Sequence, residues 1–222
     1  SSPATTCAGS LPTTTRYRPW ALPRSWHARG AGRTAVQDLR PLAARRAQRL
    51  AVELGLMIVT CDTSPRGLNI PGDSESWDFG VGAGFYLDAT QAPWNGHWCM
   101  ESYLVRELLP RLARELPLDG NRLGITGHSM GGHGALTLAL RHPGLFKSLS
   151  ALAPICAPTQ CPWGKHAFTG YLGQDESAWA AHDASALMAT QNSAPYPQGI
   201  LVDQGLADKF LEVQLHPHLL EA

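Results

Sequence analysis

The segment from Gly127 to Gly131, which reads G-H-S-M-G, constrains the fold of this chain more than any other feature. It matches the tight turn G-x-S-x-G that joins a strand to a helix in one class of serine enzymes. Residues 122–126 before it predict a short buried strand, and residues 130–141 after it, rich in Ala and Leu, predict a helix. A Gly-rich loop without chemistry is the alternative, but this flanking pattern favours a nucleophilic Ser129 at a helix N-terminus, where negative charge is stabilised.

Helical and strand-like patterns alternate along the rest of the chain. The sequence predicts helices near 47–54, 99–115 and 209–220, and strands at 56–60, 148–153 and 199–202. Short apolar strands that alternate with helices are typical of a parallel sheet covered on both faces. We therefore expect an α/β fold, in which residues 154–196, rich in Pro, Gly and Trp, form an insertion over the active-site edge.

The first 45 residues differ from the rest in composition. They are rich in Arg, Pro, Ser and Thr, and residues 1–50 hold nine arginines but a single acid, Asp38. Apolar residues in 1–45 follow neither a helical nor a strand period. This segment is therefore predicted to be a poorly structured leader before a domain at 46–222. An organelle-targeting leader and a basic arm for nucleic acid are two interpretations of this leader. We favour a third, in which the segment is foreign to the domain.

Composition excludes several classes of function. A chain of 222 residues with 44% hydrophobic content has room for one ordinary domain. It has no run of about 20 apolar residues, so we expect no membrane span. Its five cysteines form no C-x-x-C pair, so we expect no metal site and free thiols, as in a cytoplasmic protein.

Several longer strings resemble the S-formylglutathione hydrolase family, also called esterase D, from about residue 47 to the C-terminus. They are Asp62 to Gly67 (D-T-S-P-R-G), Ser76 to Gly80 (S-W-D-F-G), Gly82 to Tyr86 (G-A-G-F-Y), Gly127 to Gly134 (G-H-S-M-G-G-H-G), Ala153 to Cys156 (A-P-I-C), Cys161 to Lys165 (C-P-W-G-K) and Asp203 to Asp208 (D-Q-G-L-A-D). The resemblance implies an α/β-hydrolase fold and a cytoplasmic enzyme that splits S-formylglutathione into glutathione and formate. It also implies formaldehyde detoxification, side activity on small esters and no cofactor.

The resemblance implies three catalytic positions in this chain. Ser129 matches the nucleophile, Asp208 the acid that orients the catalytic histidine, and the Met130 backbone N–H one oxyanion donor. Asp208 also follows the strand at 199–202 through a Gly-containing turn, in the chain order Ser, Asp, His of this fold. Asp203 is the rival carboxylate, but its position in Asp-Gln-Gly suits a turn-forming role.

Three further residues are candidates for substrate binding. Trp163, Lys165 and Arg66 lie in or next to the matching strings, and a doubly acidic peptide such as glutathione needs cationic partners. Ordinary loop packing is the alternative interpretation for all three.

The sequence departs from the family in two places. The family's second oxyanion donor lies in a Gly-Leu-Thr-Cys loop and its histidine in a Gly-Tyr-Asp-His segment, and neither string occurs here. We therefore expect a domain truncated at both ends, without the catalytic histidine and with impaired activity. His216 and His218 are the remaining histidines after Asp208, on a predicted solvated helix face. Missing outer strands would expose sheet edges, which favours aggregation or a homodimer.

Two other functions stay open from the sequence. A Ser-His-Asp triad can pass an acyl group to water or to another acceptor. A general carboxylesterase or acyltransferase is therefore one alternative. A non-catalytic fragment that binds or oligomerises is the other. Nucleic-acid binding has no recognition motif to support it.

Overall fold

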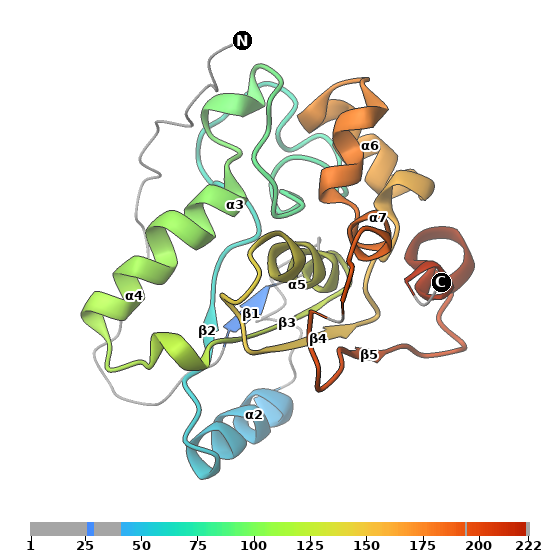
Figure 1. Ribbon diagram of the computed structural model, residues 1–222. Helices are drawn as coiled ribbons and strands as arrows, with labels where there is room; N and C mark the ends of the chain where they lie inside the picture. The colour runs from blue at the N-terminus through green and yellow to red at the C-terminus, as the bar shows by residue number, and fades with distance from the viewer. Residues whose placement is uncertain (1–25, 29–40, 194, 221–222) are drawn as a thin grey trace.

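A five-stranded parallel sheet forms the centre of the computed structural model, which describes residues 26–28, 41–193 and 195–220 (Figure 1). The strands in sheet order are β2 (Val59–Thr60), β1 (Trp26–Ala28), β3 (Gly124–His128), β4 (Ser148–Leu152) and β5 (Leu201–Asp203). All four pairings are parallel. The carboxyl ends of the strands therefore meet at one edge of the sheet, and the predicted parallel α/β sheet is confirmed.

Helices lie on both faces of this sheet. The α-helices are α2 (Pro41–Glu53), α3 (Met100–Ser102), α4 (Leu109–Glu115), α5 (Met130–Arg141), α6 (Pro162–Leu172) and α7 (Ala184–Ala189). The π-helical turns are η2 (Tyr103–Leu108) and η6 (Leu211–Leu215), and the 3-10 turns are η1 (Trp94–Gly96), η3 (Gly120–Arg122), η4 (Pro158–Gln160), η5 (Glu176–His182) and η7 (Pro217–Leu219). Figure 1 shows α5 on one face of the sheet and α2 on the other.

Helix α5 is the centre of the core. All residues from 130 to 140 are buried, since the helix lies between the sheet and the segment that carries α6 and α7. Gly134 in this helix leaves room for the ring of Tyr86, and a Cβ at residue 134 would lie only 2.2 Å from the Tyr86 Cδ2 atom. Tyr86 itself is 2% exposed. This close approach holds the 85–86 segment against the helix.

Two predicted boundaries at the centre of the chain change in the structure. The strand predicted at 122–126 runs from Gly124 to His128, because residues 120–122 form the turn η3. Asp119 caps that turn by accepting a hydrogen bond from the Asn121 N–H at 2.9 Å. The helix predicted at 99–115 is a continuous helical stretch, but its middle, η2, is π-helical.

The predicted helix at 209–220 is wrong. The chain forms the short π-turn η6, then places His216 in the left-handed region with a φ of 47°, and ends in the 3-10 turn η7. Pro217 explains the break, because its ring disfavours the right-handed helical conformation for the residue before it and it lacks an N–H for helical bonding.

Two other predicted segments are only partly described. Residues 154–196, predicted to be an insertion, contain α6, η5 and α7. The leader predicted at 1–45 lies mostly outside the described residues, but β1 and the start of α2 fall within it, so this stretch is not wholly without regular structure. None of the helices in the described ranges has the length and apolar character needed to cross a bilayer.

We predict that Gly134→Ala destabilises the protein by about 1–3 kcal/mol, because the new methyl group overpacks against Tyr86. The gain in helix propensity from Gly to Ala, about 1 kcal/mol, opposes this effect without cancelling it. Urea denaturation measures the change. Gly96→Ala is the control, since a Cβ at this exposed position meets nothing within 4 Å. Equal stability of the two variants would contradict the close packing at Gly134.

Candidate active site

Ser129 occupies a strained turn between β3 and α5. Its φ of 56° and ψ of −121° are unusual for a residue with a Cβ, and such backbone strain is common at functional sites. Three backbone hydrogen bonds hold it there. The Ser129 N–H donates to the Leu152 carbonyl at 2.9 Å, and the Ser129 carbonyl accepts from the N–H groups of His133 at 3.0 Å and Ile155 at 3.4 Å.

The segment after β4 lies directly against this turn. A Cβ at Gly132 would come within 2.8 Å of the Pro154 Cβ, so only glycine permits this approach. Ala153 has a φ of 43°, and its N–H donates to the Asp203 carbonyl at 2.7 Å. The ends of β3, β4 and β5 are thus joined side by side around Ser129.

The first turn of α5 provides donors for a negative charge. Met130 is the first residue of the helix, and its backbone N–H has no acceptor within the helix, because the first four N–H groups of any α-helix lack one. The helix dipole adds positive potential at the same end. This position fits the predicted oxyanion donor. The prediction that no second donor is present concerns residues 1–46, most of which lie outside the described residues.

The two candidate carboxylates differ in their surroundings. Asp203 ends β5 and is exposed, whereas Asp208 is half-buried. Asp208 Oδ1 accepts a hydrogen bond from the Phe210 N–H at 2.9 Å, which fixes this carboxylate at the start of η6. Its Oδ2 atom has no hydrogen bond among the described residues. Asp208 therefore keeps one oxygen available for a partner, in line with its predicted role.

No histidine in the described ranges is hydrogen-bonded to the Ser129 hydroxyl or to the Asp208 carboxylate. His128 is exposed. His216 packs edge-on against His218, with ring centroids 5.8 Å apart, and its buried Nε2 atom has no partner in the described part of the chain. In the described residues, neither C-terminal histidine thus forms a hydrogen bond with the predicted nucleophile.

The predicted binding residues divide into two environments. Trp163 packs edge-on against Trp77, with ring centroids 5.0 Å apart, and against Phe210 at 4.8 Å, close to Asp208 in sequence. Lys165, on the same helix, is exposed. Phe210 was not among the residues predicted from the sequence, in which the available signal was an aromatic residue two positions after Asp208.

Arg66 lies in a different kind of contact. Its Nε and Nη2 atoms both donate to Asp62 Oδ1, at 3.1 and 2.9 Å. The pair is largely exposed, so it contributes little to stability. Asp62 nevertheless occupies the Arg66 guanidinium, which was expected to bind a substrate carboxylate.

His133, one turn after Ser129, is a buried neutral histidine. Burial lowers the pKa of its imidazole to about 4, and its Nδ1 atom has no hydrogen-bond partner among the described residues. The ring lies near the rings of Phe85 and Phe168, with centroids 5.6 and 6.3 Å away. His133 therefore packs in the core and does not face the Ser129 hydroxyl as a base.

The cysteines in the described ranges do not form a reactive site. Cys61, Cys156 and Cys161 have free thiols, whereas Cys99 is in a disulfide, which corrects the expectation of free thiols throughout. Burial raises the pKa of Cys161 to about 11, so this thiol stays protonated, and its Sγ caps α6 by accepting from the Gly164 N–H at 3.4 Å. The described residues contain no cluster of three or more metal-ligating side chains.

Comparison with known proteins gives consistent matches. Residues 39–222 match the Esterase family, described as "Putative esterase". The chain is 53% identical over 165 residues to an S-formylglutathione hydrolase of Rattus norvegicus, covering 74% of this chain and 57% of the relative. It is 50% identical over 177 residues to an S-formylglutathione hydrolase of Arabidopsis thaliana, covering 79% of this chain and 61% of the relative. The chain therefore spans about three fifths of the length of these two relatives.

Solved structures agree with these matches. An S-formylglutathione hydrolase from Agrobacterium tumefaciens superposes with a TM-score of 0.82 at 44% identity, covering 90% of this chain and 70% of that one. The Staphylococcus aureus serine hydrolase FphF superposes with a TM-score of 0.59 at 17% identity, which shows a shared fold alone. Both are consistent with an α/β-hydrolase architecture.

We predict that stability falls between pH 7.5 and 5.5, partly because of His133. The folded-state pKa of about 4 lies below the ordinary value of 6.5, so the unfolded chain takes up a proton that the folded chain does not. This contribution to stability is complete above pH 6.5 and decreases as the pH falls towards 4. At pH 5.5 the loss is on the order of 1 kcal/mol per such histidine.

Urea denaturation at the two pH values measures this loss. His133→Phe should reduce the difference by roughly 1 kcal/mol. His182, whose pKa burial also lowers to about 4, contributes in the same direction. Replacing the exposed His97 by Phe should leave the difference intact. An unchanged pH dependence in His133→Phe would show that His133 is protonated in the folded state.

Proposed function

The chain belongs to the S-formylglutathione hydrolase family of α/β-hydrolases, and from this membership we propose that it hydrolyses S-formylglutathione to glutathione and formate. The observation that carries the proposal is the strained turn at Ser129, at the N-terminus of the buried helix α5. Strands β1 and β4 flank the strand β3 that leads into this turn, and the Leu152 carbonyl at the end of β4 accepts from the Ser129 N–H. Formaldehyde detoxification follows from that reaction.

The proposed reaction has two steps. In the first, Ser129 Oγ attacks the thioester carbonyl, loses its proton to a base, and expels the glutathione thiolate to leave a formyl ester on Ser129. In the second, water adds to this ester, and formate leaves as the serine regains its proton. The Met130 N–H donates to the oxyanion formed in each step, and one such donor is typically worth about 3 kcal/mol. No metal or organic cofactor takes part.

We assign the orienting acid to Asp208 and infer that the general base is a histidine outside the contacts described above. The free Oδ2 of Asp208 supports the first assignment. His216, eight residues further on, is the alternative base within this chain, because its buried Nε2 has no partner in the described ranges. Without a histidine hydrogen-bonded to Ser129 and Asp208, the turnover of this chain is lower than that of an enzyme with a complete Ser-His-Asp triad.

Substrate recognition is proposed for Trp163 and Lys165. Trp163 packs on Phe210, which places an aromatic surface beside Asp208, and Lys165 presents an exposed ammonium group on the same helix. Arg66 is the weaker candidate because Asp62 already binds its guanidinium. The proposed partner is thus a small glutathione thioester in the cytoplasm, rather than nucleic acid or a membrane. A homodimer is compatible with the open outer edge of β5 among the described strands.

Two other functions have specific support. General esterase activity on small acyl esters is favoured by the match to the Esterase family, since the same nucleophile serves esters and thioesters. A non-catalytic role is favoured by the absence, in the described ranges, of a histidine in contact with Ser129.

We predict that the purified 222-residue chain hydrolyses S-formylglutathione above the buffer rate and that Ser129→Ala abolishes this activity. Loss of the nucleophile should lower the rate at least about 100-fold or to background. Ser193→Ala, at an exposed position, is the matched control and should keep the wild-type rate. Asp208→Asn should lower the rate more than Asp203→Asn. Identical rates for wild type and Ser129→Ala would refute the proposed nucleophile.

We also predict that added imidazole increases the rate of the wild type but not of Ser129→Ala. If the site contains a nucleophile without a bound base, a small base that diffuses in can accept the serine proton. A fluorophosphonate probe gives a second readout, because it labels Ser129 directly. His216→Gln tests the alternative base. A wild-type rate that imidazole leaves unchanged and His216→Gln abolishes would assign the base to His216.

A further inference from the structure

A polar cavity lies beside the C-terminal end of α5, away from Ser129. Its volume is about 210 Å³, and its walls come from the loop before α3, from α3 and η2, and from the ends of α5 and η5. Ser129 is at the other end of the 12-residue helix, about 18 Å along its axis. The cavity is also smaller than the roughly 300–1000 Å³ pockets that hold drug-sized ligands. It therefore suits a ligand of a few atoms and is separate from the proposed active site.

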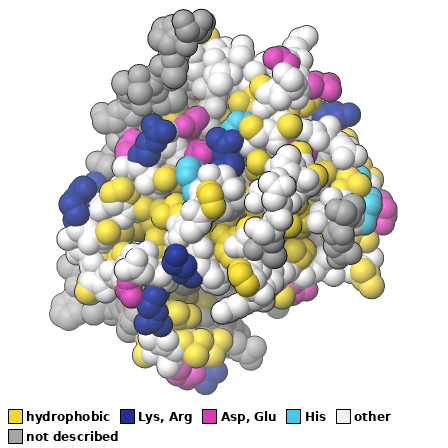
Figure 2. Space-filling model, viewed as in Figure 1, with side chains coloured by type: hydrophobic (Ala, Val, Ile, Leu, Met, Phe, Trp, Pro, Cys, Tyr) yellow, Lys and Arg dark blue, Asp and Glu magenta, His cyan; other side chains and the backbone are white. Residues whose placement is uncertain are grey.

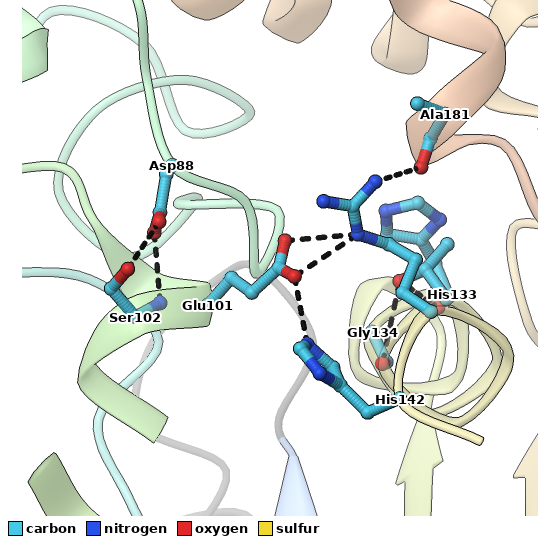
Figure 3. Close-up of polar contacts among 9 residues, drawn as sticks. Asp88, Glu101, Ser102, His133, Gly134, His142 and Ala181 are labelled. Atoms are coloured by element: carbon cyan, nitrogen blue, oxygen red, sulfur yellow. Dashed lines mark hydrogen bonds and ion pairs between the residues drawn. The ribbon is translucent and has the colours of Figure 1, made fainter. Parts of the chain in front are cut away.

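The two carboxylates in the cavity wall already accept hydrogen bonds on every oxygen (Figure 3). Asp88 accepts from the Ser102 N–H at 2.9 Å and from the Ser102 hydroxyl at 2.5 Å. Glu101 accepts from Arg141 Nε on both oxygens, at 3.0 and 3.1 Å, and lies 2.8 Å from His142 Nε2. Glu101 is nearly buried, with 10% of its side chain exposed. These acids thus serve to fix their neighbours and offer little to a cationic ligand.

Several donors in the same wall have capacity left over. Arg106 makes no hydrogen bond or ion pair with the described residues. Arg141 donates its Nη1 to the Ala181 carbonyl at 2.6 Å, and its Nη2 has no partner in the described ranges. His142 donates its Nε2–H to Glu101, whereas His182 makes no hydrogen bond with the described residues. Figure 2 shows basic, acidic and histidine side chains close together on this face of the molecule.

The balance of donors and acceptors determines the class of ligand. Acceptors are satisfied, whereas two guanidinium groups and the His182 imidazole can still donate, so an anion with several oxygen atoms completes the hydrogen bonding. Arginine forks match the geometry of phosphate and carboxylate oxygens. The Glu101 contact also fixes the Arg141 guanidinium before any ligand binds, which lowers the entropy cost of binding.

We propose that this cavity binds a small oxyanion of the phosphate or carboxylate type, held by Arg106, Arg141 and His182. Burial and the positive charge of Arg141 lower the pKa of His182 to about 4, so His182 is neutral near pH 7 and donates through one ring nitrogen. The site occupies a joint between three segments, because Arg141 bonds to both Glu101 and Ala181. Binding of the anion should therefore stabilise the folded chain.

Thermal unfolding of the full chain in sodium phosphate, sodium formate or sodium chloride at constant ionic strength tests the proposal. A saturable rise in melting temperature with phosphate or formate, but not with chloride, is expected from binding to the folded state. Phosphate and formate represent the two sources of oxyanion, and the one that binds more tightly identifies the class. The absence of a saturable rise with either anion would overturn the proposal.

A matched pair of variants locates the site. Arg106→Gln should raise the apparent dissociation constant about tenfold, the usual effect of losing one charge-assisted hydrogen bond. Arg114→Gln removes the same charge from the same helical stretch outside the cavity wall and should leave the constant unchanged. An equal effect in both variants would mean non-specific electrostatic binding and would contradict the proposal.

A second variant changes the geometry without changing the charge. Arg141→Lys keeps a positive charge but loses the planar guanidinium, so it should weaken anion binding. If this variant does not fold, the comparison of Arg106→Gln with Arg114→Gln still tests the site. Isothermal titration calorimetry measures the constants directly. Unweakened binding in a folded Arg141→Lys protein would exclude Arg141 as a ligand.

Discussion

The left-handed backbone of Ser129 is the constraint on which the rest of this structure depends. A residue in that conformation costs of order 1–3 kcal/mol and persists only where its neighbours fix it. Here β4 fixes it from one side, through the hydrogen bond to the Leu152 carbonyl, and α5 from the other, through the His133 N–H. Pro154 packs over Gly132 and closes the third side. The strained turn at Ser129 therefore depends on β4, on α5 and on the segment after β4 at the same time.

Helix α5 connects two polar regions of different character. Its N-terminus carries Ser129 and free N–H groups, whereas its C-terminus ends at Arg141, which bonds to Glu101 on α3. The helix between them is buried along its length and rich in Ala, Leu and Gly. Such a helix transmits position well, because close-packed interiors have low compressibility. The Glu101 contact thus helps to hold the C-terminal end of the helix whose other end carries Ser129, the proposed nucleophile.

Sequence reasoning succeeded where the signal was local. The bounds of α5 and the conformation expected at Ser129 follow from a few adjacent residues, and the structure places both as predicted. It failed at residues 209–220, because Pro217 overrides an apparently helical pattern. Contacts such as Trp163 with Phe210, or Glu101 with Arg141, join residues about 40 or more positions apart. Such contacts cannot be predicted from a local sequence pattern, because they depend on how distant elements pack in three dimensions.

The glycine contacts around α5 also limit how this sequence can vary. Gly134 faces the ring of Tyr86, and Gly132 faces Pro154, at separations that leave no room for another atom. A larger residue at either glycine is tolerated only if its opposite residue becomes smaller in the same lineage. We therefore expect substitutions at the two positions of each pair to occur together in related sequences.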